Sequence, residues 1–268
     1  MGLLINILKD HIKWRHQIFK LAKSDIIKTY SGSALGWAWA VIKPTILILI
    51  FWFVFEIGLR VQNGAEGIPF ILWLISGLVP WFFMDEMITG GTMAYLVYSY
   101  LVTKMKFPVS TISTFIGVSK LIVNLFLMAI VVVIFCLYGR FPDIYYLQLP
   151  FYILLMFLFF VNWALFAAML SAISKDFMNV VASLVTAVFW MSGVMFNVRG
   201  IENPVIKTLL KFDPVTFLAE GFRDVFIYKV WFWDKPYDCA AFAVMLLLMI
   251  ILALWSYKKL NKEIPDVL

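Results

Sequence analysis

The sequence predicts an all-α integral membrane protein with six transmembrane helices, an N-terminal amphipathic interfacial helix, and two short re-entrant helices on the outer side. Of its 268 residues, 63% are hydrophobic and only 14% are charged, whereas soluble domains are about half apolar and a quarter charged. The mean hydropathy is +0.93. Because one aqueous core cannot hide so much apolar surface, we expect a single transmembrane domain over residues 1–268.

Residues 3–30 are predicted to form one amphipathic helix. Apolar residues recur at steps of three and four, and basic residues follow the neighbouring stripe. The apolar set is Leu4, Leu8, Ile12, Phe19, Ala22, Ile26 and Tyr30. A helix that is apolar on one side and cationic on the other lies in the membrane plane on the anionic cytoplasmic leaflet.

The stretch from Asp25 to Pro44 is expected to lead the chain into the membrane. It combines small residues with Trp37, Trp39 and a step from Lys43 to Pro44. Tryptophan prefers headgroup depth, a lysine can extend to the aqueous side, and proline fits the first turn of a helix.

Six apolar runs follow, each long enough to cross about 30 Å of hydrocarbon as a helix. They cover residues 37–59, 68–90, 111–138, 149–171, 177–198 and 239–257. An even number of crossings places both termini on one side. The short connections rich in Lys and Arg lie on the same side as the termini, so the positive-inside rule predicts that both termini are cytoplasmic.

The fourth and fifth runs carry small residues at helical spacing. These are Ala164, Ala168 and Ala172 in the fourth, and Ser183 with Ala187 in the fifth. Such faces let membrane helices approach closely. We interpret them as packing surfaces without chemistry.

The segment 199–237 is too charged to span a membrane, yet it alternates charges with apolar and aromatic residues. Pro204 and Pro214 each begin a helix-like stretch, as proline does at a first turn. We expect two short amphipathic helices that dip into the outer leaflet. Glu220, Arg223 and Asp224 are expected to form local ion pairs, with contact to a charged substrate as the alternative.

No catalytic or metal-binding pattern is found, so we predict no enzyme and no cofactor in this chain. HExxH, GxSxG, CxxC and P-loop motifs are all absent from the sequence. His11 and His16 fall on the amphipathic helix and are interpreted as solvated. The adjacent Asp85 and Glu86 could neutralise Lys120, or one of them could face an aqueous cavity. The net charge of +6 is explained by membrane topology, and no nucleic acid partner is expected.

The connection between the second and third runs ends in a short basic and apolar stretch, LVTKMKFP. A carrier without its own ATP site must receive energy from a partner. A short cytoplasmic helix that docks into a groove on the partner is one way to couple the two.

Four stretches together resemble the ABC-2 permease family that exports O-antigen, capsule and teichoic-acid polymers. They are DIIKTYSGSALGWAWAVIKP at 25–44, GLVPWFF at 77–83, LVTKMKFP at 101–108 and DPVTFLAEGFRDVF at 213–226. Their order and spacing match across nearly the whole chain. One departure is Asp213, where the family more often has Asn before Pro; it adds charge to the outer segment.

The resemblance implies a homodimer in a bacterial inner or plasma membrane, paired with two copies of a separate ABC ATPase that binds ATP and Mg. It implies a substrate polymer carried on a polyprenyl pyrophosphate or related lipid. The surface that couples to the ATPase is expected at Leu101, Lys104, Met105, Lys106, Phe107 and Pro108. The outer gate is expected to include Phe217, Glu220, Arg223, Asp224, Trp231 and Trp233.

We expect an aromatic-lined channel at the homodimer interface, with a cytoplasmic entrance at the N-terminal helix. The entrance set is Lys9, Lys13, Lys20, Lys23, Lys28, Tyr30 and Trp37. Cationic side chains there would accept the pyrophosphate of the lipid-linked glycan. The alternatives are an ABC-2 exporter of drugs, lipids or ions, a membrane-bound lipid-linked sugar transferase, and a structural membrane component.

Overall fold

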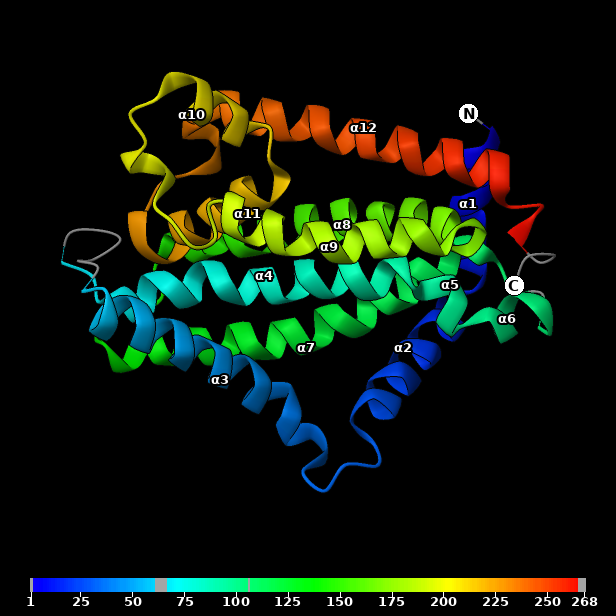
Figure 1. The fold of residues 1–268 in the computed structure, drawn as a ribbon, viewed down its shortest axis with the longest axis horizontal. Coiled ribbons are helices and arrows are strands. Elements are labelled where there is room, and N and C mark those ends of the chain that lie inside the picture. The colour runs from blue at the N-terminus through cyan, green and yellow to red at the C-terminus, as the bar shows by residue number, and fades with distance from the viewer. Residues whose placement is uncertain (1, 61–66, 106, 265–268) are drawn as a thin grey trace.

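The structure is a computed structural model in which residues 2–60, 67–105 and 107–264 are described, and all regular structure among these residues is helical. Figure 1 shows an elongated bundle whose long helices run along one axis, with α2 and α3 splayed away from one side. The long helices are α4 (Phe70–Thr92), α7 (Val109–Leu137), α8 (Leu149–Ile173), α9 (Lys175–Met191) and α12 (Pro236–Leu260).

Shorter helices lie at both ends of the bundle and along its side. The N-terminal group is α1 (Gly2–Lys13), α2 (Arg15–Tyr30), the 3-10 turn η1 (Gly36–Ala38), α3 (Trp39–Trp52) and the π-helical η2 (Phe53–Gly58). At one end lie α5 (Ala94–Val97) and α6 (Ser99–Thr103), and at the other η3 (Ile144–Gln148), η4 (Val198–Gly200), α10 (Pro204–Lys211), α11 (Pro214–Arg223), η5 (Asp224–Tyr228) and η6 (Phe232–Asp234).

Helix α4 is the centre of the bundle. Its sequence is apolar apart from a few polar residues, among them Asp85 and Glu86, which is the pattern of a helix buried over most of its surface. It packs against α3, α7, α8, α9 and α11. Small residues allow the close approach: a Cβ built on Gly91 of α4 would lie 2.8 Å from the Cβ of Ala164 on α8. Ala164, Ala168 and Ala172 are all buried, which confirms the predicted packing face. On α9, by contrast, Ser183 and Ala187 are exposed.

Five helical segments among the described residues are long and apolar enough to cross a membrane. They cover residues 36–58, 70–92, 109–137, 144–173 and 236–260. The fifth predicted run, 177–198, corresponds to α9, whose 17 residues extend about 26 Å along the helix axis. This helix ends at Met191 because the following chain becomes extended at Ser192 and the Gly193 amide donates to Thr216 Oγ1 of α11 (2.8 Å).

The N-terminal segment is two helices rather than the single helix expected over residues 3–30, because the chain is not helical at Trp14. The face of α2 that packs on the bundle consists of Ile18, Ala22 and Ile26. Much of the predicted apolar stripe does not share this burial, since Leu4, Leu8, Ile12 and Phe19 are exposed. Residue spacing alone fits more than one stripe along α2, and packing against α7 decides which side is covered.

The start of α1 and the end of α12 lie at the end of the bundle that carries α5 and α6, whereas α10 lies at the opposite end (Figure 1). Helix α1 packs against α7 and α12 there. The predicted coupling stretch and the predicted outer segment therefore occupy opposite ends of the molecule.

Candidate functional site

The two short helices of the outer segment begin as the sequence predicts. Asn203 precedes Pro204 and accepts hydrogen bonds from the amides of Val205 (2.9 Å) and Ile206 (3.3 Å) at the start of α10. Asp213 precedes Pro214 and accepts from the amides of Val215 and Thr216 at the start of α11. Side-chain acceptors satisfy the first amides of a helix, and proline at the first position needs no partner.

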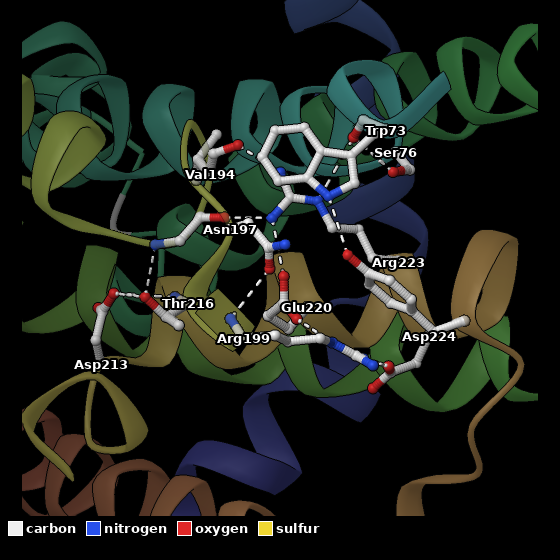
Figure 2. Close-up of polar contacts among 12 residues, drawn as sticks. Trp73, Ser76, Val194, Asn197, Arg199, Asp213, Thr216, Glu220, Arg223 and Asp224 are labelled. Carbon is white, nitrogen blue, oxygen red and sulfur yellow. Dashed lines mark hydrogen bonds and ion pairs between the residues drawn. The ribbon is translucent and has the colours of Figure 1, made fainter. Parts of the chain in front are cut away.

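Arg223, at the end of α11, is the centre of a buried polar cluster (Figure 2). Its side chain is fully buried. The guanidinium donates to the carbonyls of Gly193 and Val194, the latter at 2.5 Å, and more weakly to the Trp73 carbonyl at 3.5 Å. Its Cζ lies 3.6 Å from the centroid of the Trp73 ring. Arg223 therefore joins α11 to α4 and to the chain that follows α9.

Carboxylates complete the cluster. Glu220 accepts from Arg223 at 3.0 Å and from Arg199 at 3.1 Å. Asp224 pairs with both Arg199 and Lys235. Burial raises the pKa of Asp224, while Lys235 and Arg199 act in the opposite direction. The predicted ion pairs among the outer residues are thus present, and they reach two cations, Arg199 and Lys235, that the sequence did not point to.

A cavity of about 260 Å³ adjoins this cluster. Its lining includes Phe217 and Glu220 of α11 and Asp224 of η5, together with Arg199 and Lys235. The other two predicted gate residues lie elsewhere: Trp231 and Trp233 stack on one another with ring centroids 4.3 Å apart. The structure therefore brings four of the six predicted outer residues together and leaves the two tryptophans as a separate pair.

The predicted coupling stretch is partly internal. Leu101 and Phe107 are buried, and the Phe107 amide donates to the Leu101 carbonyl (3.0 Å). Lys104 and Met105 are exposed, Met105 at 62%, and Pro108 precedes α7. The helix here is α6, which ends at Thr103, and Lys104 and Met105 form a turn after it. Lys106 lies outside the described residues.

Helix α2 is tied to this end of the bundle by polar contacts. The Asp25 carboxylate accepts hydrogen bonds from the Tyr98 hydroxyl and the Ser119 hydroxyl. On α1, the His11 ring bonds to Thr114 Oγ1 at 2.7 Å, so this histidine is anchored to α7 rather than solvated as predicted.

The predicted entrance residues divide into two groups. The lysines are exposed: Lys9, Lys13, Lys20, Lys23 and Lys28. Lys28 lies 5.4 Å from the centroid of the Tyr98 ring. At the end of α2, Tyr30 stacks on the exposed Trp37 with centroids 5.4 Å apart, and burial, with Glu86 and Asp25 nearby, raises the pKa of Tyr30 to about 12.

A second cavity, of about 510 Å³, lies between the corner of α2 and α3 and the helices α4 and α7. Its lining includes Tyr30, Trp39 and Lys43 from the corner, Phe82, Asp85 and Glu86 from α4, and Lys120 and Asn124 from α7. Glu86 pairs with Lys120 at 3.5 Å. Of the two alternatives for the adjacent carboxylates, the structure assigns the ion pair to Glu86 and places both beside a cavity.

Both cavities are lined by charged, hydrogen-bonding and aromatic side chains. Within the described ranges, no cluster of three or more His, Cys, Asp and Glu side chains could hold a metal ion. The chemistry available is recognition through charge, hydrogen bonding and aromatic contact.

The chain is similar to one protein family and to individual proteins with related names. A family model described as ABC-2 type transporter matches residues 16–227. The chain is similar to the O-antigen export system permease protein RfbA of Myxococcus xanthus, with 24% identity over 224 residues that cover 83% of this chain and 85% of that protein. It is also similar to a Klebsiella pneumoniae protein of the same name, with 22% identity over 209 residues that cover 77% of this chain and 78% of that protein.

Proposed function

This chain belongs to the ABC-2 type transporter family, and on that premise we propose that it is the permease subunit of an ATP-driven exporter. Its substrate would be a lipid-linked polysaccharide such as O-antigen, capsule or teichoic acid, moved from the cytoplasm outward. The observation that carries the proposal is the similarity, over more than three quarters of the chain, to proteins named O-antigen export permeases.

A six-span topology with cytoplasmic termini in a bacterial inner or plasma membrane is part of the proposal. The described chain ends lie at one end of the bundle (Figure 1), and an odd number of crossings would separate them. Counting α9 as a crossing makes the number even. Its 17 residues cover most of the hydrocarbon thickness of about 30 Å.

Energy would come from two copies of a separate ABC ATPase that binds ATP and Mg. Lys104 and Met105 form an exposed basic and apolar tip at the cytoplasmic end. The tip is fixed to the bundle by the buried Leu101 and Phe107. A protruding tip on a rigid base is suited to transmit the movement of a partner.

The export pathway would be an aromatic-lined channel between two copies of the chain. Little of α3 is buried within one chain, and α9 exposes small residues together with Trp190 and Met191. Small residues favour close helix association in membranes. An uncovered apolar surface on both helices is compatible with a homodimer whose two halves enclose the polymer.

The exposed lysines of α1 and α2 would receive the pyrophosphate at the entrance. Replacing Lys9, Lys13, Lys20 and Lys23 together by Glu should abolish export because four attractive charges become repulsive. The ATPase should still copurify with this variant. Reversing Lys258 and Lys259, which are exposed at the end of α12, provides a matched control. Unchanged export in the fourfold variant would contradict this role.

Depletion of the protein in its source cells tests the proposed function as a whole. A surface glycan should disappear while its lipid-linked precursor accumulates inside. A normal surface glycan combined with sensitivity to drugs or ions would favour an exporter of small molecules. Formation of a sugar-lipid product by the purified chain alone would instead identify a transferase.

A further inference from the structure

The cavity between the α2–α3 corner and helices α4 and α7 has polar groups that the proposed function does not use. Its volume of about 510 Å³ falls within the usual range for ligand sites, about 300–1,000 Å³. Its lining includes Thr29 and Tyr30 at the end of α2, which follow the exposed Lys28 in the sequence.

Asn124 contributes an unpaired acceptor to the cavity wall. It is 2% exposed, and its Nδ2 donates to the Val79 carbonyl at 2.7 Å. The orientation of the amide is thereby set, and Oδ1 is left to accept. Among the described residues, no donor reaches this oxygen. Buried polar atoms nearly always have partners, so a donor is missing from the cavity.

Asp85 adds a second acceptor, which is partly exposed rather than buried. The structure gives its carboxylate no hydrogen bond or ion pair with any described residue, whereas the neighbouring Glu86 is paired with Lys120. The lining therefore presents acceptors and requires a ligand that donates hydrogen bonds.

The charge of the lining argues against a phosphate ligand. Asp85 and Glu86 balance Lys43 and Lys120, so the cavity offers an anion no net attraction. A phosphate also carries acceptor oxygens and cannot satisfy Asn124 or Asp85. The hydroxyl groups of a sugar can donate to both, and Tyr30, Trp39 and Phe82 offer aromatic faces for the apolar face of a sugar ring.

We propose that this cavity is a carbohydrate-binding site that holds uncharged sugar residues of the transported glycan through Asp85, Asn124 and the aromatic side chains around them. The assignment rests on the proposed function, because it takes the substrate to be a glycan. It divides recognition between two places: the exposed lysines of α2 bind the anion, and the cavity binds the sugars.

Photo-crosslinking in the source cells tests this assignment. Benzoylphenylalanine is placed at Phe82 or Leu47, which line the cavity, and at Leu158 of α8, which does not. Leu47 and Leu158 are a matched pair, with 37% and 39% exposure. Light should produce a carbohydrate-staining adduct at Phe82 or Leu47 but not at Leu158.

Mild acid distinguishes the sugar from the lipid carrier, because it cleaves the bond between sugar and pyrophosphate. An adduct formed on sugar keeps its carbohydrate stain after this treatment, which is the expected result. An adduct that loses the stain was formed on the lipid and overturns the proposal. Absence of adducts from both cavity positions in cells that still export the glycan also overturns it, whereas glycan export that is unaffected by depletion rejects the proposed function itself.

Asp85→Asn provides a second measurement. It keeps the size of the side chain and removes the charge, so crosslinking of the glycan at Phe82 should fall about tenfold, as expected for losing a charge-assisted hydrogen bond. Asp176→Asn, an exposed carboxylate at the start of α9, should leave the yield unchanged. Equal yields in the two variants, at equal protein levels, would contradict the role of Asp85.

Discussion

Replacing Gly77 by Ala tests whether Arg223 fixes the outer segment to the bundle. Gly77 lies on α4 directly against the guanidinium: a Cβ built there comes within 2.5 Å of Nη2 and 2.9 Å of Cζ. Atoms in ordinary contact are about 3.5–4.0 Å apart, so Arg223 must move by about 1 Å. Since its carbonyl partners belong to backbone, the side chain cannot move that far and keep both hydrogen bonds.

The cost follows from the contacts that are lost. Hydrogen bonds to charged groups contribute about 1.5–3 kcal/mol each, so losing those from Arg223 to Gly193 and Val194 costs about 3–6 kcal/mol. Alanine is favoured over glycine inside a helix by about 1 kcal/mol. We therefore expect Gly77→Ala to lower the free energy of unfolding by about 2–5 kcal/mol.

Gly90→Ala is the control, because it lies on the same helix and a Cβ built there meets nothing within 4 Å. Both variants gain the same helix propensity, and only one displaces Arg223. When both variants are measured in the same detergent, the melting temperature of Gly77→Ala should be at least about 5 °C lower than that of Gly90→Ala. Adding Gly77→Ala to Arg223→Met should change little further. Equal melting temperatures for the two glycine variants would refute the reasoning.

Three further results are expected. Burial raises the pKa of Asp213, so the folded protein binds the carboxyl proton of Asp213 more tightly than the unfolded chain does. The free energy of unfolding should therefore fall as the pH rises from about 3.9 through the raised pKa. Asp213→Asn should flatten that part of a plot of melting temperature against pH. Met105→Asp should reduce copurification of the ATPase about tenfold at an unchanged melting temperature, because it makes the exposed coupling tip polar and acidic. Val97→Asp, also at an exposed position, should leave copurification unchanged. Equal loss of the ATPase in both variants would contradict the coupling role. Asp25→Ala removes the acceptor of two hydroxyl groups and should lower the free energy of unfolding by about 3–6 kcal/mol. Thermal unfolding measures this effect against Asp176→Ala, and equal stability of the two variants would contradict it.

The class of fold and the places of the long helices were predictable because they depend on local hydropathy. The apolar run from residue 68 appears as Phe70–Thr92 and the run from residue 111 as Val109–Leu137. The buried face of α2 was not predictable, because the period of a helix allows several stripes. Contacts with other helices, including Asp25 with Ser119, decide which stripe is covered.

The partners of Arg223 could be predicted only in part. Its pairing with Glu220 is local in sequence, three residues apart. The carbonyls it binds belong to residues 29 to 150 positions away, and no sequence period specifies contacts of that separation. One signal was present: Gly77 interrupts a charge-free apolar run, and a glycine there provides the space that a large buried side chain needs.

The polar groups at the two ends of the protein differ in whether they have partners within the chain, and this difference indicates different roles for the two ends. Arg223 and Asp224 are buried but paired, Arg223 with Glu220 and Asp224 with Arg199 and Lys235. This cluster therefore stabilises one packing of the segment 199–237. At the inner cavity, Asn124 Oδ1 is buried without a donor among the described residues. The partly exposed Asp85 beside it makes no side-chain hydrogen bond or ion pair with those residues, so the site can accept a ligand that donates hydrogen bonds. Substitutions in the outer cluster should therefore lower stability and export together. Asp85→Asn should lower export at unchanged stability, because no contact within the described chain is lost.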